Sequence, residues 1–163
     1  MSKILISGYY GFANAGDEAM LTAIIESLRQ VEKNVELTVL SGNPEDTAAK
    51  HQVCSVYRFN PLGIIRAMKD SELIISGGGS LLQDVTSKRS LLYYLSIIGL
   101  GKFFGKKVML FAQGIGPIRA KWARKLTSLV CNEVDLITVR DSESAVELIE
   151  MGVKPEKITV TAD

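Results

Sequence analysis

Short apolar runs alternate with longer amphipathic segments along the whole chain. Runs of four to six mostly apolar or β-branched residues predict strands, and segments with apolar side chains three and four positions apart predict helices. The predicted strands are residues 3–7, 35–40, 53–56, 72–75, 107–111, 136–139 and 157–160. The predicted helices are residues 17–32, 61–68, 87–104, 119–131 and 142–151, with a further short helix beginning at Pro44. This alternation is typical of βαβ units around a parallel sheet.

We therefore predict an α/β fold, a Rossmann-like parallel sheet flanked by helices, in a single domain over residues 1–163. Gly105 and Gly152 directly follow predicted helices, where glycine commonly ends a helix in the left-handed conformation. A chain of 163 residues can bury one sizeable core. Because the sequence stops at Asp163 directly after a predicted strand, we expect it to be one half of a longer protein.

Composition narrows the classes of function. The chain is 47% hydrophobic and 23% charged, which is typical of a folded globular protein rather than a disordered one. Its 19 Lys and Arg residues nearly balance 18 Asp and Glu residues, so the formal net charge is +1 and no overall field attracts nucleic acid. We therefore expect no nucleic-acid partner, and any basic surface must be local.

The cysteines and the apolar segments bear on the cellular compartment. Cys54 and Cys131 lie far apart and outside any CxxC or Cys/His cluster, so neither a disulfide framework nor a metal site is predicted. The N-terminus lacks the features of a signal peptide, and the longest apolar run, residues 91–101, is shorter than the roughly 20 residues that span a bilayer. A reducing, cytoplasmic location fits these features best.

Three predicted strands are followed by glycine-rich loops, which cover residues 8–18, 76–80 and 112–117. Glycine lets backbone N–H groups approach a ligand closely, and the start of a following helix favours an anion. A single such loop is equally well explained as a tight turn from strand to helix. Three loops at one edge of a sheet predict a shared cleft, because ligands bind beyond the carboxyl ends of parallel strands.

The spacing of the glycines excludes two common nucleotide sites. Gly11 and Gly16 have the spacing of a phosphate-binding P-loop, but Asp17 stands where that motif needs lysine. A carboxylate at that position would repel a triphosphate. None of the three loops contains the GxGxxG pattern of dinucleotide-binding proteins. NTPase and NAD-dependent functions are therefore not predicted.

Polar residues in the first loop are candidates for chemistry. Asp17 follows Gly16 in a loop directed at the cleft, so it is either a general base that accepts a proton from a sugar hydroxyl or a helix cap. For Glu18 we predict the capping role, because carboxylates are favoured at helix starts. His51 is predicted to be a surface histidine, which argues against a Ser/His/Asp triad.

Further candidates follow two other strands. Ser80, Gln83 and Asp84 suit the vicinal hydroxyls of a sugar, or they cap the long helix that begins near residue 87. Arg140 could hold a carboxylate or phosphate in a bidentate manner, or it could pair with Asp141 or Glu143. Both alternatives stay open for each group.

Several ordered motifs resemble one known family. Residues 8–19, 76–84, 89–94, 113–117 and 139–141 are similar to segments of the polysaccharide pyruvyl transferase family, and within it to the bacterial enzymes that pyruvylate secondary cell-wall polymers for surface-layer anchoring. The resemblance covers essentially the whole chain. Ala13 is a departure, because glycine is more usual at that position.

This resemblance implies a glycosyltransferase-B-like enzyme of two Rossmann-like halves, of which this chain resembles the N-terminal half, the C-terminal domain being absent. The family transfers an enolpyruvyl group from phosphoenolpyruvate to an N-acetylmannosamine-containing, lipid-linked precursor of a cell-wall glycan. A 4,6-ketal forms and phosphate is released. The resemblance implies phosphoenolpyruvate as co-substrate, no cofactor, no metal, and an inactive fragment when this half is alone.

The resemblance also assigns roles to residues of this chain. Asp17 would be catalytic. The acid histidine and most cations that bind the donor would lie in the other half. The residues expected to bind the acceptor are Asn14, Gly77, Gly78, Gly79, Ser80, Gln83 and Arg89. The residues expected to border the donor are Gln113, Gly114 and Arg140.

Three alternatives stay open. Residues 91–107 either lie at the inner face of the cell membrane as a peripheral contact or form a helix that packs on the sheet. The enzyme could instead be a glycosyltransferase-B protein that uses a nucleotide sugar. The domain could also bind sugar without catalysis. The oligomeric state is not predicted.

Overall fold

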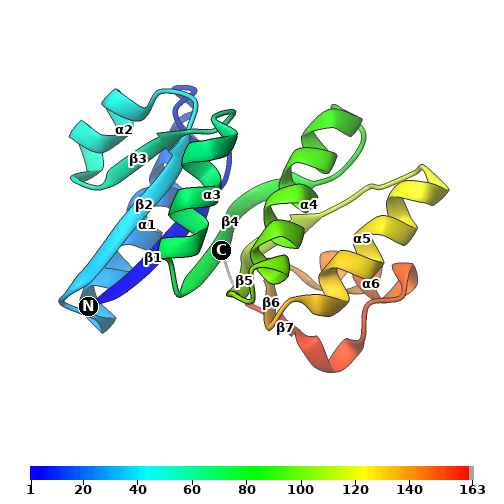
Figure 1. Cartoon of the computed structure of the whole chain (residues 1–163). Helices are drawn as coiled ribbons and strands as arrows, with labels where there is room; N and C mark the ends of the chain where they lie inside the picture. The colour runs from blue at the N-terminus through cyan, green and yellow to red at the C-terminus, as the bar shows by residue number, and fades with distance from the viewer. Residues whose placement is uncertain (162–163) are drawn as a thin grey trace.

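Strands and helices alternate through residues 1–161, which are the residues that this computed structural model describes (Figure 1). The strands are β1 (Ser2–Ser7), β2 (Val35–Ser41), β3 (Cys54–Tyr57), β4 (Leu73–Leu82), β5 (Lys107–Ile115), β6 (Leu136–Val139) and β7 (Ile158–Val160). The helices are α1 (Ala15–Val31), α2 (Pro44–His51), α3 (Pro61–Asp70), α4 (Lys88–Phe103), α5 (Lys121–Glu133) and α6 (Ser142–Met151), with a 3-10 turn η1 (Pro155–Lys157).

All strands pair in parallel in one sheet of order β3-β2-β1-β4-β5-β6-β7. Strand order reverses between β1 and β4, where Ser7 pairs with Ser76. Along the same edge, Gly79 pairs with Gln113 and Gln113 with Val139. The predicted Rossmann-like fold is confirmed, and the strands bring all three glycine-rich segments to one edge of the sheet.

Local signals explain where the helices begin and end. Pro44 and Pro61 occupy first-turn positions, where the missing N–H and fixed φ of proline suit a helix start. The Oγ of Ser87 accepts a hydrogen bond from the N–H of Ser90 at the start of α4. Gly152 ends α6 in the left-handed region at φ 108°. Predicted helices therefore agree with the observed ones to within about two residues at most ends.

The predicted ends of two strands are wrong. β4 continues past Ile75 to Leu82, and β5 continues past Phe111 to Ile115. The ladder between them persists through Gly79, and after a register shift Leu82 pairs with Ile115. The glycine triplet is thus part of a strand, and the loop to α4 begins only after it. Sequence reasoning ended β4 at the glycines because glycine usually breaks a strand.

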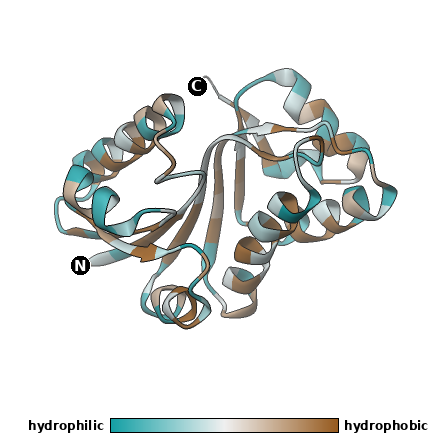
Figure 2. Ribbon diagram, turned by 90° about the horizontal axis from the view of Figure 1, so that it is seen from above, coloured by the Kyte–Doolittle hydropathy of each residue, from teal (hydrophilic) through white to brown (hydrophobic). Residues whose placement is uncertain are grey.

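Apolar side chains fill both faces of the sheet. On one face, α1 contributes Leu21, Ile24 and Ile25 to a cluster with alternate residues of β1, β2 and β4. On the other face, α3 to α6 contribute to a larger cluster centred on β4 and β5. Figure 2 shows the brown, apolar strands enclosed between helices whose outer surfaces are largely teal. Coverage of both faces is what a parallel sheet requires.

The residues of α4 decide between the two interpretations of the apolar segment. Tyr94, Ile97 and Ile98 are at most 3% exposed and pack in the core. Phe103, near the end of the helix, is 80% exposed. The buried residues follow the sheet-packing interpretation, and only the rim of the segment is free to contact another surface. Among residues 1–161, no helix combines the length and the apolar character that crossing a bilayer needs.

Candidate functional site

A polar pocket lies beyond the carboxyl ends of β1 and β4, where the strand order reverses. It encloses about 230 Å³. Its lining comes from the first glycine loop, the end of β4 and the start of α4: Tyr9, Asp17, Ser80, Leu81, Gln83, Thr86, Ser90 and Tyr94. Ligand pockets usually exceed roughly 300 Å³. The pocket therefore suits one small polar group, such as a single sugar ring, rather than an entire large ligand.

Asp17 is the only carboxylate among the residues that line this pocket. The N-cap of α1 is Asn14, whose Oδ1 accepts from the N–H of Asp17 at 3.2 Å, so Asp17 itself is not the cap. Burial and the neighbouring negative charge of Glu18 raise the pKa of Asp17 above its usual range. A carboxylate with a raised pKa is a better proton acceptor at neutral pH, as a general base requires.

The polar side chains around Asp17 are already partly engaged. Ser80 Oγ accepts from Arg140 Nη2 at 2.8 Å, and Gln83 Oε1 accepts from the N–H of Thr86 at 2.9 Å. Tyr94 is 2% exposed, its burial raises the pKa to about 12, and its hydroxyl has no hydrogen-bond partner within the described residues. The Tyr94 hydroxyl and the amide of Gln83 therefore retain capacity to bond a hydroxylated ligand.

Side chains of α1 fill the space above the glycine triplet. A Cβ at Gly77 would lie 2.8 Å from Ile24 Cδ1, and one at Gly78 would lie 2.1 Å from Met20 Cγ. Gly78 and Gly79 also have positive φ, at 50° and 80°. A Cβ at Gly79 would lie 3.0 Å from Asp17 Oδ1. Close packing of α1 thus explains Gly77 and Gly78, whereas Gly79 leaves room for Asp17 beside the pocket.

The third glycine segment reaches the pocket only through Arg140. Gln113 is fully buried and donates from Nε2 to the carbonyl of Ser76 at 2.9 Å, so it does not line the pocket. A Cβ at Gly114 would lie 2.4 Å from the guanidinium carbon of Arg140, which therefore needs glycine beneath it. Arg140 Nε also lies 3.6 Å from Asp141 Oδ2. The predicted pairing of Arg140 with Asp141 therefore occurs, and its predicted hold on a carboxylate or phosphate stays a prediction.

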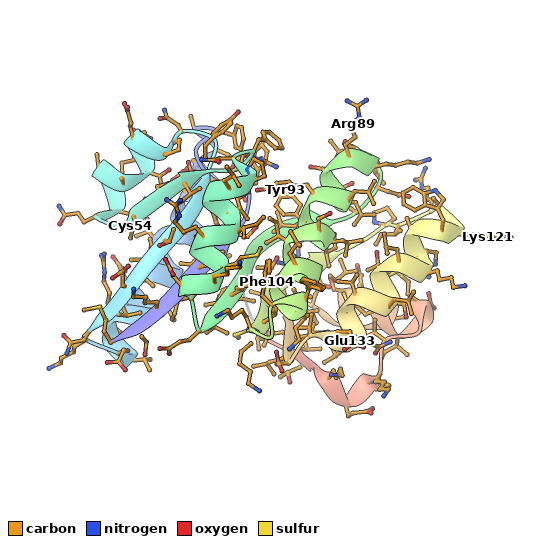
Figure 3. All side chains as sticks on the ribbon, in the orientation of Figure 1. Cys54, Arg89, Tyr93, Phe104, Lys121 and Glu133 are labelled. Carbon is orange, nitrogen blue, oxygen red and sulfur yellow. The ribbon has the colours of Figure 1, made fainter. Side chains whose placement is uncertain are left out.

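Two candidate residues that follow β4, Asp84 and Arg89, lie elsewhere than predicted. Asp84 accepts from the N–H groups of Ala120 and Arg119, and these bonds lower its pKa, so it organises the start of α5 rather than capping α4. Arg89 is exposed at the start of α4 and lines a neighbouring cavity, not the polar pocket. Figure 3 shows Arg89 projecting away from the start of α4.

Sequence reasoning missed the contacts that hold the first loop. Glu18 does not cap its own helix, since its Oε1 accepts from the N–H of Gly11 at 2.9 Å. Its Oε2 lies 3.2 Å from His51 Nε2, and the His51 side chain is only 9% exposed, so the predicted surface histidine is a partly buried partner of Glu18. Residues 33 positions apart give no sequence signal for this pair. Ala13 adopts φ 57°, which explains why glycine suits that position better.

The buried Tyr10 was also missed. It is 1% exposed and donates from its hydroxyl to the carbonyl of Gly77 at 3.2 Å, which ties the first loop to the glycine triplet. Burial, with a contribution from the charge of Asp17, raises the pKa of Tyr10 far above its usual value. Tyr10 therefore stays a neutral hydrogen-bond donor. Within residues 1–161, no group of three His, Cys, Asp or Glu side chains is arranged to hold a metal ion.

Comparison with known proteins gives one family match. A family model described as polysaccharide pyruvyl transferase matches residues 14–163. No curated protein matches the chain. The family match spans Asn14, Asp17 and every other predicted site residue.

Several solved structures share the fold. The Anabaena protein HepE in complex with UDP-glucose has a TM-score of 0.67 at 13% identity, covering 99% of this chain and 44% of that one. The lipopolysaccharide outer core galactosyltransferase WaaB has a TM-score of 0.59 at 14% identity, covering 100% of this chain and 46% of that one. For S. aureus MnaA with UDP, the TM-score is 0.55 at 16% identity, with coverages of 99% and 44%.

The likeness to these structures concerns the fold. The predicted fold, a Rossmann-like sheet of the kind found in glycosyltransferase-B enzymes, is confirmed. The chain spans less than half the length of each of these three structures.

Proposed function

Because the chain belongs to the polysaccharide pyruvyl transferase family, we propose that it forms the acceptor-side domain of a pyruvyltransferase. The enzyme transfers an enolpyruvyl group from phosphoenolpyruvate to a lipid-linked glycan precursor containing N-acetylmannosamine. The products are a 4,6-ketal and phosphate. The observation that supports an acceptor role best is the small polar pocket with the half-buried Asp17 at the point where strand order reverses.

The proposed chemistry begins with protonation of the methylene carbon of phosphoenolpyruvate, which makes C2 electrophilic. A sugar hydroxyl attacks C2 and gives its proton to Asp17, and phosphate leaves. The second hydroxyl then closes the ketal and gives its proton to the released phosphate. Asp17 suits this step because its raised pKa favours proton acceptance. We assign the acid and most of the cations around the donor to a second domain.

Other residues of the pocket position the acceptor in this proposal. Gln83 and Tyr94 bond its hydroxyls, while Arg140 holds Ser80 in place and borders the donor. Gln113 and Gly114 contribute indirectly, because Gln113 secures Ser76 and Gly114 makes room for the Arg140 guanidinium. Asn14 acts by capping the start of α1, which positions Asp17 at the pocket.

We place the enzyme in the cytoplasm, with peripheral contact at the inner face of the membrane. Exposed apolar side chains on α3 and α4, including Leu62 at 76% and Phe103 at 80% exposure, support such a contact. Residues 57–107 carry eight Lys or Arg and three Asp or Glu side chains, a net charge of +5, against −4 for the rest of the chain. Apolar and basic groups together favour an anionic bilayer surface.

The proposal is tested by following two products with the natural full-length protein. Release of phosphate from phosphoenolpyruvate, dependent on the acceptor, is the expected result. Release of UDP from a UDP-sugar would instead assign a glycosyltransferase activity, an alternative suggested by the UDP bound to HepE and MnaA. Neither product, together with binding of the acceptor, would indicate a non-catalytic sugar-binding protein. Residues 1–163 alone are expected to release no phosphate.

A further inference from the structure

A buried arginine without an acidic partner lies beside the polar pocket. Arg58, just after β3, is 6% exposed, and its Nε has no hydrogen-bond partner within the described residues. Its guanidinium carbon lies 4.5 to 5.8 Å from four aromatic ring centres, those of Phe12, Phe59, Tyr93 and Tyr94. No carboxylate within residues 1–161 forms an ion pair with Arg58.

Aromatic rings compensate a cation only in part. Their negative faces attract the guanidinium, but they accept no strong hydrogen bonds from its five N–H donors. A buried charge normally has an oppositely charged partner or a full set of hydrogen bonds. Among the residues described, the guanidinium of Arg58 therefore lacks a counter-charge, which an anionic ligand would supply.

The start of α4 adds positive charge at the same place. Its first turn contains Lys88 and Arg89 and no acidic residue, although the helix dipole favours carboxylates there. The first N–H groups of a helix also lack partners within the helix. Lys88 lies near the Asp84 carboxylate, whose pKa is lowered by the Ala120 and Arg119 N–H groups first and by Lys88 after them. Arg89 has no ion-pair partner in the described part of the chain.

Arg58 and Arg89 line one cavity of about 410 Å³. The rest of its lining is Phe59, Ser87, Ser90 and Tyr93, so three hydroxyls accompany the two cations. Figure 3 shows Tyr93 between α3 and α4, below Arg89. Guanidinium forks, hydroxyls and a helix start are the groups that proteins use to bind phosphate oxygens.

The cavity lies between two others of different character. It shares Ser90 with the polar pocket that contains Asp17. It shares Arg58, Phe59 and Tyr93 with an apolar groove between α3 and α4. An anion held there would therefore have a polar neighbour on one side and an apolar neighbour on the other.

We propose that the cavity of Arg58, Ser87, Arg89 and Ser90 binds a phosphate or diphosphate group. The group belongs either to a soluble phosphorylated ligand that enters the polar pocket or to the headgroup of a phospholipid at a membrane surface. Both share the chemistry of phosphate oxygens, and experiment separates them. The site goes beyond the proposed transfer reaction, because it requires neither phosphoenolpyruvate nor the acceptor hydroxyls.

The test is calorimetric titration of the natural full-length protein with inorganic diphosphate, repeated with Arg89→Ala and Lys88→Ala. Both side chains are exposed, and each substitution removes one positive charge from the same helical turn. Only Arg89 lines the cavity. Arg89→Ala is expected to weaken diphosphate binding about tenfold, and Lys88→Ala to weaken it less than about twofold. Arg58→Lys, checked for a native thermal midpoint, is expected to weaken it as well because the planar fork is lost.

A second titration uses vesicles of phosphatidylglycerol, with phosphatidylcholine vesicles as reference. Binding of diphosphate that depends on Arg89 supports a soluble ligand, and binding of anionic vesicles alone that depends on Arg89 supports a headgroup. Equal effects of Arg89→Ala and Lys88→Ala in both titrations, or no binding in either, would overturn the proposal. Failure of phosphate release from phosphoenolpyruvate leaves this result unaffected, so the two proposals fail separately.

Discussion

Two helices begin at the edge of the sheet that carries the polar pocket, and their first turns have opposite charges. α1 is capped by Asn14 and begins with Asp17 and Glu18, as the helix dipole favours. α4 is capped by Ser87 and begins with Lys88 and Arg89, against the dipole. The positive potential at the start of α1 is therefore balanced by side chains of that same segment. The start of α4 keeps its positive potential for a ligand.

Packing separates the same two helices. Side chains of α1 occupy the space above the glycine triplet of β4, so this side of the pocket is closed by the protein itself. On α4, a Cβ added at Gly99 would meet nothing within 4 Å. Gly77 and Gly78 of β4 are thus explained by close packing against α1, whereas Gly99 of α4 borders open space. The same residue type has different causes at the two places.

The largest expected effect comes from breaking the packed side. Gly78→Ala in the full-length protein is expected to lower the free energy of unfolding by about 2–4 kcal/mol, because a positive φ and a collision with Met20 act together. Gly99→Ala on α4 is the matched control and should raise it by about 0.5–1 kcal/mol. Chemical denaturation measures both. A small loss for Gly78→Ala, with a raised acceptor KM, would show instead that the triplet contacts ligand.

The next effect concerns the charge that α1 presents to the pocket. Asp17→Asn is expected to lower turnover by about 100-fold or more if the carboxylate accepts a proton. Stability should not fall, because Asn14 and not Asp17 caps α1. Steady-state kinetics of phosphate release measure the change, with Asp46→Asn on α2 as an exposed control outside the pocket. Turnover near that of the unaltered enzyme would leave Asp17 without a catalytic role.

The raised pKa of Asp17 gives a smaller, pH-dependent effect. A carboxyl group whose folded-state pKa is raised stabilises the protein fully below its unfolded-state pKa of about 3.9, and this contribution is lost as pH rises through the folded-state value. Asp17→Asn removes the titration. The variant should therefore gain thermal stability relative to the unaltered protein at pH 7, and the gain should vanish near pH 3. Thermal midpoints of the two proteins across this pH range test the prediction. A difference in midpoint that stays constant with pH would contradict it.

The smallest effect sharpens the contrast at α4. Arg89→Glu places a carboxylate where the helix dipole favours it and should stabilise the protein by about 0.5 kcal/mol, while diphosphate binding is lost. Lys69→Glu makes the same charge reversal in the last turn of α3, at the negative end of a helix dipole, and should destabilise the protein. Denaturation and titration of both variants give the comparison. Equal stability changes would mean that the dipole does not explain the choice of arginine at position 89.

Sequence alone predicted the fold because its signals are local. Proline and Asn or Ser caps at helix starts, and Gly152 at the end of α6, act within a few residues. The ends of β4 and β5 could not be predicted in this way. Their ladder continues through glycines only because a neighbouring strand holds the backbone in place.

The site was predicted in its location but not in its contacts. Strand ends at a shared edge follow from the βαβ pattern, so all three glycine segments were expected to share one cleft, but residues 112–117 do not line the polar pocket. The burial of Gln113, the partner of His51 and the aromatic surroundings of Arg58 depend on segments far apart in sequence. Such contacts have no local signature. The function of the predicted site residues stays a prediction that the variants above address.

The pairing of β1 with β4 divides the pocket along the sequence as well as in space. Everything on the α1 side comes from residues before Leu73, and everything on the α4 side comes from residues after it. Each side of the pocket is therefore encoded by one uninterrupted stretch of sequence. A single recombination point near Ser71 would exchange the whole α4 wall between related sequences while Asp17 and its helix stay unchanged. Such an exchange would alter the residues that face Asp17 without altering α1 itself.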